Sequence, residues 1–350
     1  MRFILSVTAA AAALVAAAAF VSPAAADARH PTLAALTRYT SFPDRTFARA
    51  KASALPDSWA FSVVAHTGET VRIHLSKRLF ASTDTAVAQQ WADFFANLLH
   101  GPELSTLDAY LATRHEVESE CGSGALACYG GNEMIAPAQD PQIDLSSESV
   151  VAHEYGHHVA AHRLNPPWDA IDTGTKRWAS YQNVCLNTRK KKYFPGAEDR
   201  DHYFYNPGEG FAETYRVANE RLLSLQEAPW DIVTNDLYPD DNALALLEQD
   251  VSAPWTKPTA LAQSGSVTAK SSSRSFVIST PLDGSLSVKL RSSAKATFRL
   301  DVLSPEAKSL GHNTGKNTSA TATICGDRAV RVRVNRVTGS GAFRLAISRP

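Results

Sequence analysis

The hydrophobic pattern along the chain is helical in its middle and strand-like toward its C-terminus. Apolar residues at helical spacing predict helices over 84–99, 105–113, 144–164, 207–225 and 241–250. The helix over 144–164 has the clearest pattern, because serines can cap its start and a Pro-Pro pair follows its end. After the last helix, short apolar runs between turn residues predict about five or more strands, and thus a small β-sandwich.

The remaining segments are β-rich or weakly patterned. Two β-rich stretches within 61–75 flank a Thr-Gly-Glu turn and predict a hairpin. Residues 116–135 have β character at both ends and glycines in the middle, which is typical of an irregular edge hairpin. Residues 168–206 are polar, aromatic and basic in turn, and 251–273 are rich in Ser, Ala, Thr and Pro, as linkers are.

The charge distribution separates two regions of the chain. With 44% hydrophobic and 20% charged residues, the composition of the 350 residues excludes a disordered polymer. Residues 27–264 hold 20 basic and 31 acidic side chains, a net of −11, whereas 265–350 hold 14 and 4, a net of +10. We therefore expect an α+β domain over 59–250, a linker, and an all-β sandwich domain over 274–350.

The first 26 residues are typical of a secretory signal peptide. Arg2 is followed by an alanine-dominated apolar run over 3–21, and small residues precede Asp27. The alternative is a transmembrane anchor, but alanine is only marginally apolar and no second run of that length follows. We expect cleavage before Asp27 and a secreted, extracellular protein with no membrane span. Residues 27–58 are weakly patterned and are either an N-terminal arm or a pro-segment.

Export favours disulfides as the state of the four cysteines. Cys121 and Cys128 flank a short glycine-containing loop that can bring their sulfurs together, and by exclusion Cys185 would pair with Cys325. Four cysteines allow three connectivities, and only the short loop favours the local pairing. The second pair would tie the acidic region to the basic one.

The helix over 144–164 contains the sequence His153-Glu154-Tyr155-Gly156-His157. Histidines four residues apart lie on one face of a helix, so both imidazoles can reach one metal ion, with Glu154 beside them. A catalytic zinc site needs a third protein ligand and a carboxylate that takes the proton of the attacking water. The motif therefore predicts a zinc site for hydrolysis.

The helix over 207–225 carries Glu209 and Glu213, which are also four residues apart and share a face. One of them can bind the metal while the other accepts a hydrogen bond from a liganding histidine. The first turn of a helix favours a charged carboxylate, and this favours Glu209 as the ligand. The alternative is that both glutamates are solvated on an exposed helix.

Together the two motifs resemble the gluzincin metallopeptidases, nearest the lethal-factor-like branch with its HEYGH and E-x-F-A-E signatures, over roughly residues 116–225. The resemblance implies a zincin-like catalytic domain and one catalytic Zn2+, held by three protein ligands. These ligands are His153, His157 and Glu209, with Glu213 as the supporting group.

The resemblance also implies a mechanism and a substrate. Glu154 would act as the general base in the hydrolysis of a peptide bond, and residues 127–135 would form the edge strand that pairs with a polypeptide substrate. The C-terminal sandwich resembles bacterial pre-peptidase C-terminal domains, notably in the segment 325–328. Such domains accompany secreted peptidases.

One feature departs from the family pattern. A tyrosine a few residues before the third ligand helps to hold the oxyanion in the lethal-factor-like branch, but neither Tyr203 nor Tyr205 has the family spacing, so either or neither serves. His158 and His162 are also four residues apart, but no glutamate follows His158, and we expect this pair on the outer face of the helix. His202 is a spare candidate for substrate contact.

The sequence thus predicts a secreted zinc-dependent endopeptidase. Two alternatives stay open: a non-catalytic or cell-wall-binding protein with a metallopeptidase fold, and a zinc amidase acting on cell-wall peptides. The presence of Glu154 favours catalysis, because a binding protein has no need of the base. The basic sandwich favours an anionic cell-surface polymer as a further partner, bound less tightly at high salt, and no nucleic acid is expected.

Overall fold

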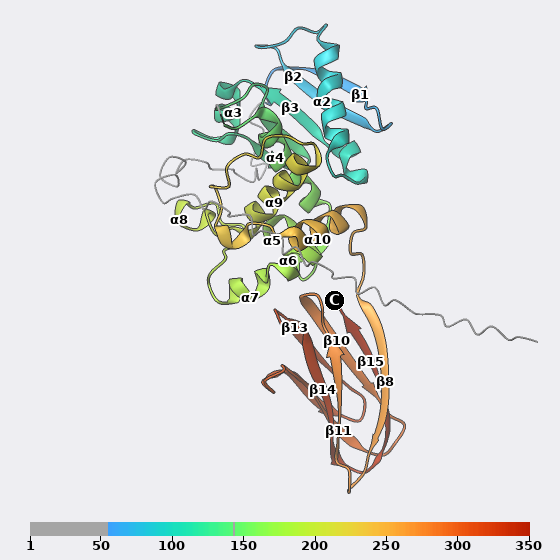
Figure 1. The fold of residues 1–350 in the computed structure, drawn as a ribbon. Coiled ribbons are helices and arrows are strands. Elements are labelled where there is room, and N and C mark those ends of the chain that lie inside the picture. Colours follow the sequence, from blue (N-terminus) through green and yellow to red (C-terminus); the bar gives the residue numbers. More distant parts are fainter. Residues whose placement is uncertain (1–54, 143) are drawn as a thin grey trace, which may run out of the picture.

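The protein forms two parts, each with its own hydrophobic core (Figure 1). The computed structural model describes residues 55–142 and 144–350. The expected signal peptide over 1–26 and most of the expected arm or pro-segment over 27–58 lie outside the described residues. The first part combines a mixed sheet with helices, and the second consists of two antiparallel sheets.

The first part begins with the expected hairpin, which joins β1 (Ser58–Val64) and β2 (Thr70–Ser76). The other strands of its main sheet are β3 (Asp108–Ala112), β4 (Cys128–Gly130) and β5 (Glu133–Pro137), and a small ladder pairs β6 (Leu164–Asn165) with β7 (Trp168–Asp169). The longer helices are α2 (Thr85–Asn97), α3 (Arg114–Cys121), α4 (Ser147–Ala161), α9 (Pro207–Leu222) and α10 (Asp241–Ser252). The short helical segments are η1 (Pro102–Thr106), α5 (Ala170–Thr173), α6 (Lys176–Tyr181), α7 (Val184–Arg189), α8 (Arg200–Tyr203) and η2 (Asn235–Leu237).

The main sheet has the strand order β1-β2-β3-β5-β4. Strands β2, β3 and β5 are parallel, while β4 runs antiparallel to β5 and forms one edge of the sheet. Helix α2 packs against β1 and β2, and α4 packs against β5 and β4. The expected edge hairpin is therefore present, but only β4 and β5 form it.

Helix α4 lies between the sheet and helix α9 and is buried on nearly all sides. Its contact with α9 is close at Gly156, where a Cβ atom would lie 2.9 Å from Cα of Ala212. Any larger residue at this point would meet the backbone of the neighbouring helix. The glycine inside the histidine motif therefore lets α4 and α9 approach, and this brings their polar residues face to face.

Two segments of the first part differ from the sequence prediction. Residues 105–113, expected as a helix, form the end of η1 and the strand β3, in which 109–112 are all buried. A central strand covered on both faces shows no alternation, so its short apolar run does not distinguish strand from helix. Residues 116–121, expected within the edge hairpin, belong instead to α3, which begins with a capping box between Thr113 and Glu116.

The second part is a sandwich of two four-stranded sheets with the orders β13-β10-β15-β8 and β12-β11-β14-β9. Its strands are β8 (Thr259–Val267), β9 (Ser273–Ser279), β10 (Gly284–Arg291), β11 (Thr297–Leu303), β12 (Ser309–Gly315), β13 (Thr318–Ile324), β14 (Ala329–Thr338) and β15 (Gly341–Arg349). The expected linker over 251–273 differs, because its middle is the edge strand β8, paired with β15. Most side chains of β8 are small and exposed, which hides the alternation of a strand.

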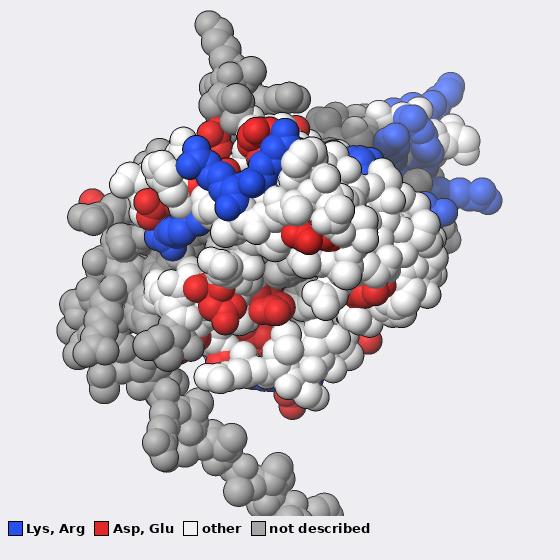
Figure 2. Space-filling model, turned by 90° about the horizontal axis from the view of Figure 1, so that it is seen from above, with Lys and Arg blue, Asp and Glu red and all other residues white. Residues whose placement is uncertain are grey.

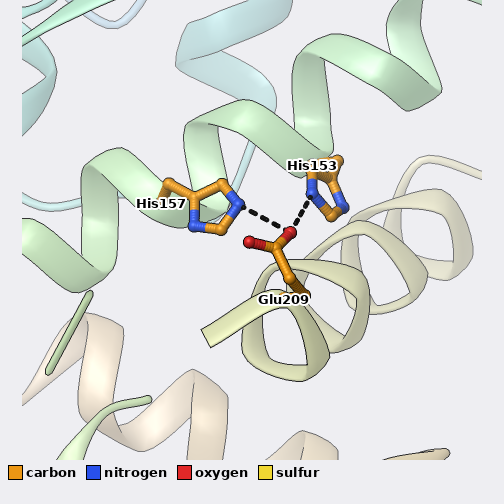
Figure 3. Close-up of side chains that lie close together, drawn as sticks. All are labelled: His153, His157 and Glu209. Atoms are coloured by element: carbon orange, nitrogen blue, oxygen red, sulfur yellow. Dashed lines mark ion pairs between the residues drawn. The ribbon is translucent and has the colours of Figure 1, made fainter. Parts of the chain in front are cut away.

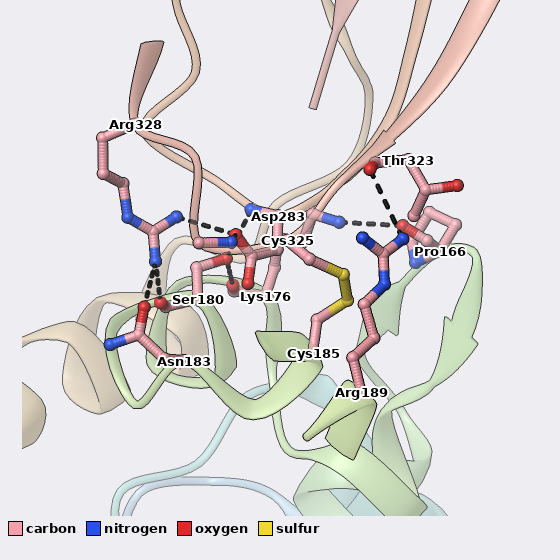
Figure 4. Close-up of a disulfide and its surroundings, with 11 residues drawn as sticks. Pro166, Lys176, Ser180, Asn183, Cys185, Arg189, Asp283, Thr323, Cys325 and Arg328 are labelled. Carbon is pink, nitrogen blue, oxygen red and sulfur yellow. Dashed lines mark hydrogen bonds and ion pairs between the residues drawn. A yellow bond between two sulfur atoms is a disulfide. The ribbon is translucent and has the colours of Figure 1, made fainter. Parts of the chain in front are cut away.

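Both disulfides expected from the sequence are present. Cys121 pairs with Cys128 and Cys185 pairs with Cys325, with Cα–Cα separations of 5.7 Å and 5.2 Å. The second disulfide joins α7 to the residue that follows β13, so it links the two parts covalently (Figure 4).

Hydrogen bonds around this disulfide hold the two parts together (Figure 4). The Arg328 guanidinium donates to the Ser180 carbonyl oxygen and, at 2.8 Å, to Oδ1 of Asp283. The backbone N–H of Asp283 donates to Oγ of Ser180 at 2.9 Å. Nearby, Nζ of Lys176 donates to the Pro166 carbonyl oxygen at 2.8 Å. The junction thus combines polar contacts between the two parts with the buried side chains of Lys176, Ser180 and Asp283.

The surface seen from above the first part is mostly uncharged (Figure 2). Acidic side chains lie in separate places on this face, and basic ones gather toward one side of it. Among the described residues, no helix is both long and apolar enough to cross a membrane.

Candidate metal centre

Helix α4 places two histidines of one motif at the buried centre of the first part. The helix starts at a defined residue, because the side chain of its N-cap Ser146 accepts a hydrogen bond from the N–H of Ser149. His153 and His157 lie one turn apart, with ring centroids separated by 5.0 Å. Their exposed fractions are 6% and 2%. Imidazoles buried to this degree need polar partners.

Helix α9 supplies the partner of both rings. Its N-cap Asn206 accepts a hydrogen bond from the first turn, and Glu209 follows within that turn. Oε2 of Glu209 lies 3.4 Å from Nε2 of His153 and 3.3 Å from Nε2 of His157 (Figure 3). Within the described part of the chain, these three residues form a buried group whose ligand atoms all lie within 4.8 Å of one another. Such a group can bind a metal ion.

The other glutamate of α9 faces the outer nitrogen of the first histidine. Oε1 of Glu213 lies 2.8 Å from Nδ1 of His153. The Arg216 guanidinium donates two hydrogen bonds to Glu213, at 2.9 Å and 2.5 Å, and one to Glu220 at 2.6 Å. Glu220 in turn accepts from Oγ of Ser149 at 2.6 Å. A buried network therefore connects α9 to the start of α4 and holds the His153 ring in place.

The charge of Glu213 determines that the Nδ1 nitrogen of the His153 ring carries a proton. Burial by itself raises the pKa of the Glu213 carboxyl, but the Arg216 guanidinium and the hydrogen bond with His153 outweigh it and lower the pKa to about 2. An ionised carboxylate can only accept, so Nδ1 of His153 carries a proton toward Glu213, and Nε2 is the nitrogen that faces Glu209.

Glu154 lies on a groove beside the two histidines. The side chain is 2% exposed and lines a cavity of about 70 Å3 together with His153. Leu126 and Ala127, which directly precede the edge strand β4, line the same cavity. The groove therefore connects the candidate general base to the edge of the sheet.

The two tyrosine candidates lie in different places. Tyr203 is 8% exposed, lines the groove, and donates from its hydroxyl to Oε2 of Glu209 at 3.0 Å. Tyr205 is 40% exposed and does not line the groove. His202 also lies outside the groove, where its ring is 2.8 Å from Oδ1 of Asp199. Of these candidates, only Tyr203 reaches the metal-binding group.

The prediction of an outer face for the second histidine pair is wrong for His158. Its side chain is fully buried, with Nε2 2.9 Å from the carbonyl oxygen of Glu103 and Nδ1 3.1 Å from the hydroxyl of Tyr129. Burial lowers the pKa of His158 to about 4, so the ring is neutral at physiological pH. His162 is exposed, as expected. The difference arises because α4 is enclosed, so its second face meets protein and not water.

Sequence reasoning misses three charged groups near the site. Arg216 follows Glu213 by three residues and Glu220 follows Arg216 by four, so helical spacing alone could have indicated this network. Asp231 lies after α9 and also lines the groove. Burial and the nearby Glu213 charge raise the pKa of Asp231 to about 7. No sequence pattern marks Asp231, because tertiary structure alone brings it to the groove.

Comparisons with known proteins assign the chain to no family. No family model matches the chain, and no curated protein matches it. Among solved structures, the chain is similar to a mitogen derived from Yersinia pseudotuberculosis, with 12% identity and a TM-score of 0.22 over 27% of this chain and 87% of that chain. It is also similar to a family GH115 4-O-methyl-alpha-glucuronidase with specificity for decorated arabinogalactans, with 9% identity and a TM-score of 0.19 over 58% of this chain and 38% of that chain. Both TM-scores are too low to support a conclusion on fold or function.

Proposed function

We propose that the protein is a secreted zinc-dependent endopeptidase of the gluzincin type, with a zincin-like catalytic domain followed by a β-sandwich. The observation that carries the proposal is the position of Glu209, whose Oε2 lies 3.4 Å and 3.3 Å from the Nε2 atoms of His153 and His157 in a buried site. Secretion is proposed from the pattern of residues 1–26 alone.

The three residues fit a zinc ion in their chemistry, and Glu209 also fits one in its distances from the two histidines. Two histidines and one glutamate are a common donor set of catalytic zinc. A tetrahedral zinc ion with bonds of about 2.0–2.2 Å separates its ligand atoms by about 3.3–3.6 Å. The separations of Glu209 Oε2 from the two histidine nitrogens, 3.4 Å and 3.3 Å, agree with that spacing. Glu213 supports the site through the Nδ1 proton of His153.

Zinc, when bound, supplies Lewis acidity and makes water a stronger nucleophile near neutral pH. The protein side chains supply the rest of the chemistry. Glu154 takes the proton of the attacking water and returns it to the leaving amine. The Tyr203 hydroxyl, now 3.0 Å from Glu209, is the donor available for the negative charge that develops on the carbonyl oxygen. We do not assign this role to Tyr205.

The edge strand β4 supports a polypeptide as the substrate. An extended peptide can add to a sheet edge through backbone hydrogen bonds. Here the residues before β4, Leu126 and Ala127, line the groove that also contains Glu154. A peptide lying along β4 would therefore pass Glu154 and His153, so we place the substrate backbone there.

The test is zinc-dependent cleavage of an unfolded, casein-like substrate by the purified protein. Activity should disappear with a chelator and return with zinc. Glu154→Gln should keep zinc, because Glu154 is not a ligand, but lose about 10²–10⁴-fold in turnover. Glu148→Gln, on the same helix but outside the groove, is the matched control. Equal activity of Glu154→Gln and the unsubstituted protein would exclude the mechanism.

The same assay separates the alternative functions. A non-catalytic binding protein would hold zinc without cleaving any polypeptide, and a zinc amidase would release products from a cell-wall digest and not from casein. For the sandwich we propose an anionic cell-surface polymer as the partner, because residues 265–350 carry 14 basic and 4 acidic side chains. Attachment that is unchanged between low and high ionic strength would rule out this partner.

A further inference from the structure

The groove beside Glu154 is lined by both apolar and acidic side chains. Leu145, Val150 and Ile232 contribute apolar side chains to its lining, and Asp144 and Asp231 contribute acidic ones. A groove that only accepted aliphatic side chains would have no use for these carboxylates. The acidic side chains of its lining therefore favour a positively charged group as the one that enters.

The one cation in the lining, Arg216, is already neutralised. Its guanidinium forms ion pairs with Glu213 at 2.5 Å and with Glu220 at 2.6 Å. Among the described residues, Asp144 and Asp231 form no ion pair with a basic side chain, and Arg216 pairs with Glu213 and Glu220 instead. The groove therefore presents two carboxylates that form no direct ion pair with a described cation.

A partly buried carboxylate without a bound cation raises the free energy of the folded protein. Burial and the charges of Glu213 and Asp144 raise the pKa of Asp231 to about 7, although the charge of Arg216 acts in the opposite direction. A cation bound beside it would offset this cost, and the methylene stem of a long basic side chain would contact the apolar walls. Both features of the lining match one kind of side chain.

We propose that the groove receives a lysine or arginine side chain of the polypeptide substrate, with Asp231 as the residue that selects its positive charge and Asp144 as a second carboxylate. The inference rests on the proposed function, because Glu154 and His153 line the same groove and place the selected residue next to the bond that is cleaved. The substrate class is then a peptide with a basic residue at that position.

The test compares peptides that differ at one position, bound to the full-length, zinc-loaded Glu154→Gln variant at pH 8. Calorimetry measures the Kd of matched peptides with lysine, norleucine or glutamate at this position. Norleucine has the four-carbon chain of lysine without its ammonium group. The lysine peptide should bind about tenfold more tightly than the norleucine peptide, as expected for a hydrogen bond to a charged group.

Substitution of the carboxylates assigns the preference to residues. Adding Asp231→Asn should remove most of the preference for lysine over norleucine, while Asp236→Asn, an exposed carboxylate outside the groove, should leave it unchanged. Circular dichroism checks folding, and Asp144→Asn, which should reduce the same preference by a smaller factor, provides a second test if Asp231→Asn does not fold. Equal Kd values for lysine and norleucine peptides would overturn the inference.

Cleavage by the unsubstituted protein tests the proposed function separately. Selective binding of lysine peptides without cleavage of any peptide would contradict the endopeptidase and leave the groove assignment standing. Cleavage without a preference for lysine over norleucine would do the reverse. If the protein neither binds nor cleaves any of the peptides, both proposals are wrong.

Discussion

The two parts of this protein bury different kinds of side chain. Between α4 and α9, the described residues bury several groups that carry or exchange charge: His153, Glu154, His157, Glu209, Glu213, Arg216 and Glu220. The core of the sandwich consists of valine, leucine, isoleucine, alanine and phenylalanine. Burying an ion costs several kcal/mol unless it is paired and hydrogen-bonded. Among the described residues of the sandwich, the buried carboxylates are Asp283 and Asp301, and each is ion-paired with an arginine. The larger cluster in the first part is therefore better explained by chemistry than by stability.

The largest expected effect concerns Glu209, the proposed metal ligand in the first part. Glu209→Ala removes one of three donor atoms and should abolish zinc binding at micromolar metal. Glu213→Ala removes only the partner of His153 Nδ1 and should weaken zinc binding about 10–100-fold. Titration of both variants with zinc measures the two affinities. A metal-free Glu213→Ala beside a zinc-binding Glu209→Ala would reverse the roles of the two glutamates.

The second prediction compares an arginine of each part. Arg216→Met leaves the buried carboxylates of Glu213 and Glu220 without their cation and should lower the free energy of unfolding by about 3–5 kcal/mol. Arg299→Met in the sandwich should cost about 1 kcal/mol or less, because the Arg299 side chain is 48% exposed and Asn335 still donates to Asp301. Urea unfolding measures both variants. Similar losses for the two substitutions would show that the contrast between the parts is not energetic.

The third prediction concerns the junction, where Lys176 is 1% exposed. Burial lowers the pKa of Lys176 to about 8 from its ordinary 10.5, against the attraction of Asp283 and Asp250. Between pH 8 and pH 10.5, Lys176 is protonated in the unfolded chain but not in the folded protein. The free energy of unfolding therefore rises with pH in this interval. The rise approaches about 3 kcal/mol and is absent below pH 8, where both states are protonated.

Lys176→Met lacks this titration, so the difference in unfolding free energy between the two proteins should change across that interval. Chemical unfolding at several pH values from 7 to 10.5 measures it. Parallel pH curves for the two proteins would show that Lys176 does not titrate at a lowered pKa in the folded protein.

Much of the candidate site could be predicted because each of its residue pairs depends on spacing within a single helix. His153 and His157 share a face of α4 for the same reason that Glu209 and Glu213 share a face of α9. The β-sandwich was predictable from its turns and alternating runs, and the pairing of Cys185 with Cys325 followed by exclusion. The strand β3 was not predictable, because burial on both faces removes the alternation that marks a strand.

What the sequence by itself determined is the set of local geometries: two helices that each present a pair of ligand-type residues, and strands with one apolar face. The tertiary structure decided which groups meet. Gly156 allows α4 and α9 to approach, and this brings Glu209 to both histidines. The segment after α9 brings Asp231 to the groove that Glu154 also lines, although the two residues are far apart in the sequence. Helical geometry is fixed by the backbone over a few residues, whereas contacts between distant segments depend on how whole faces pack.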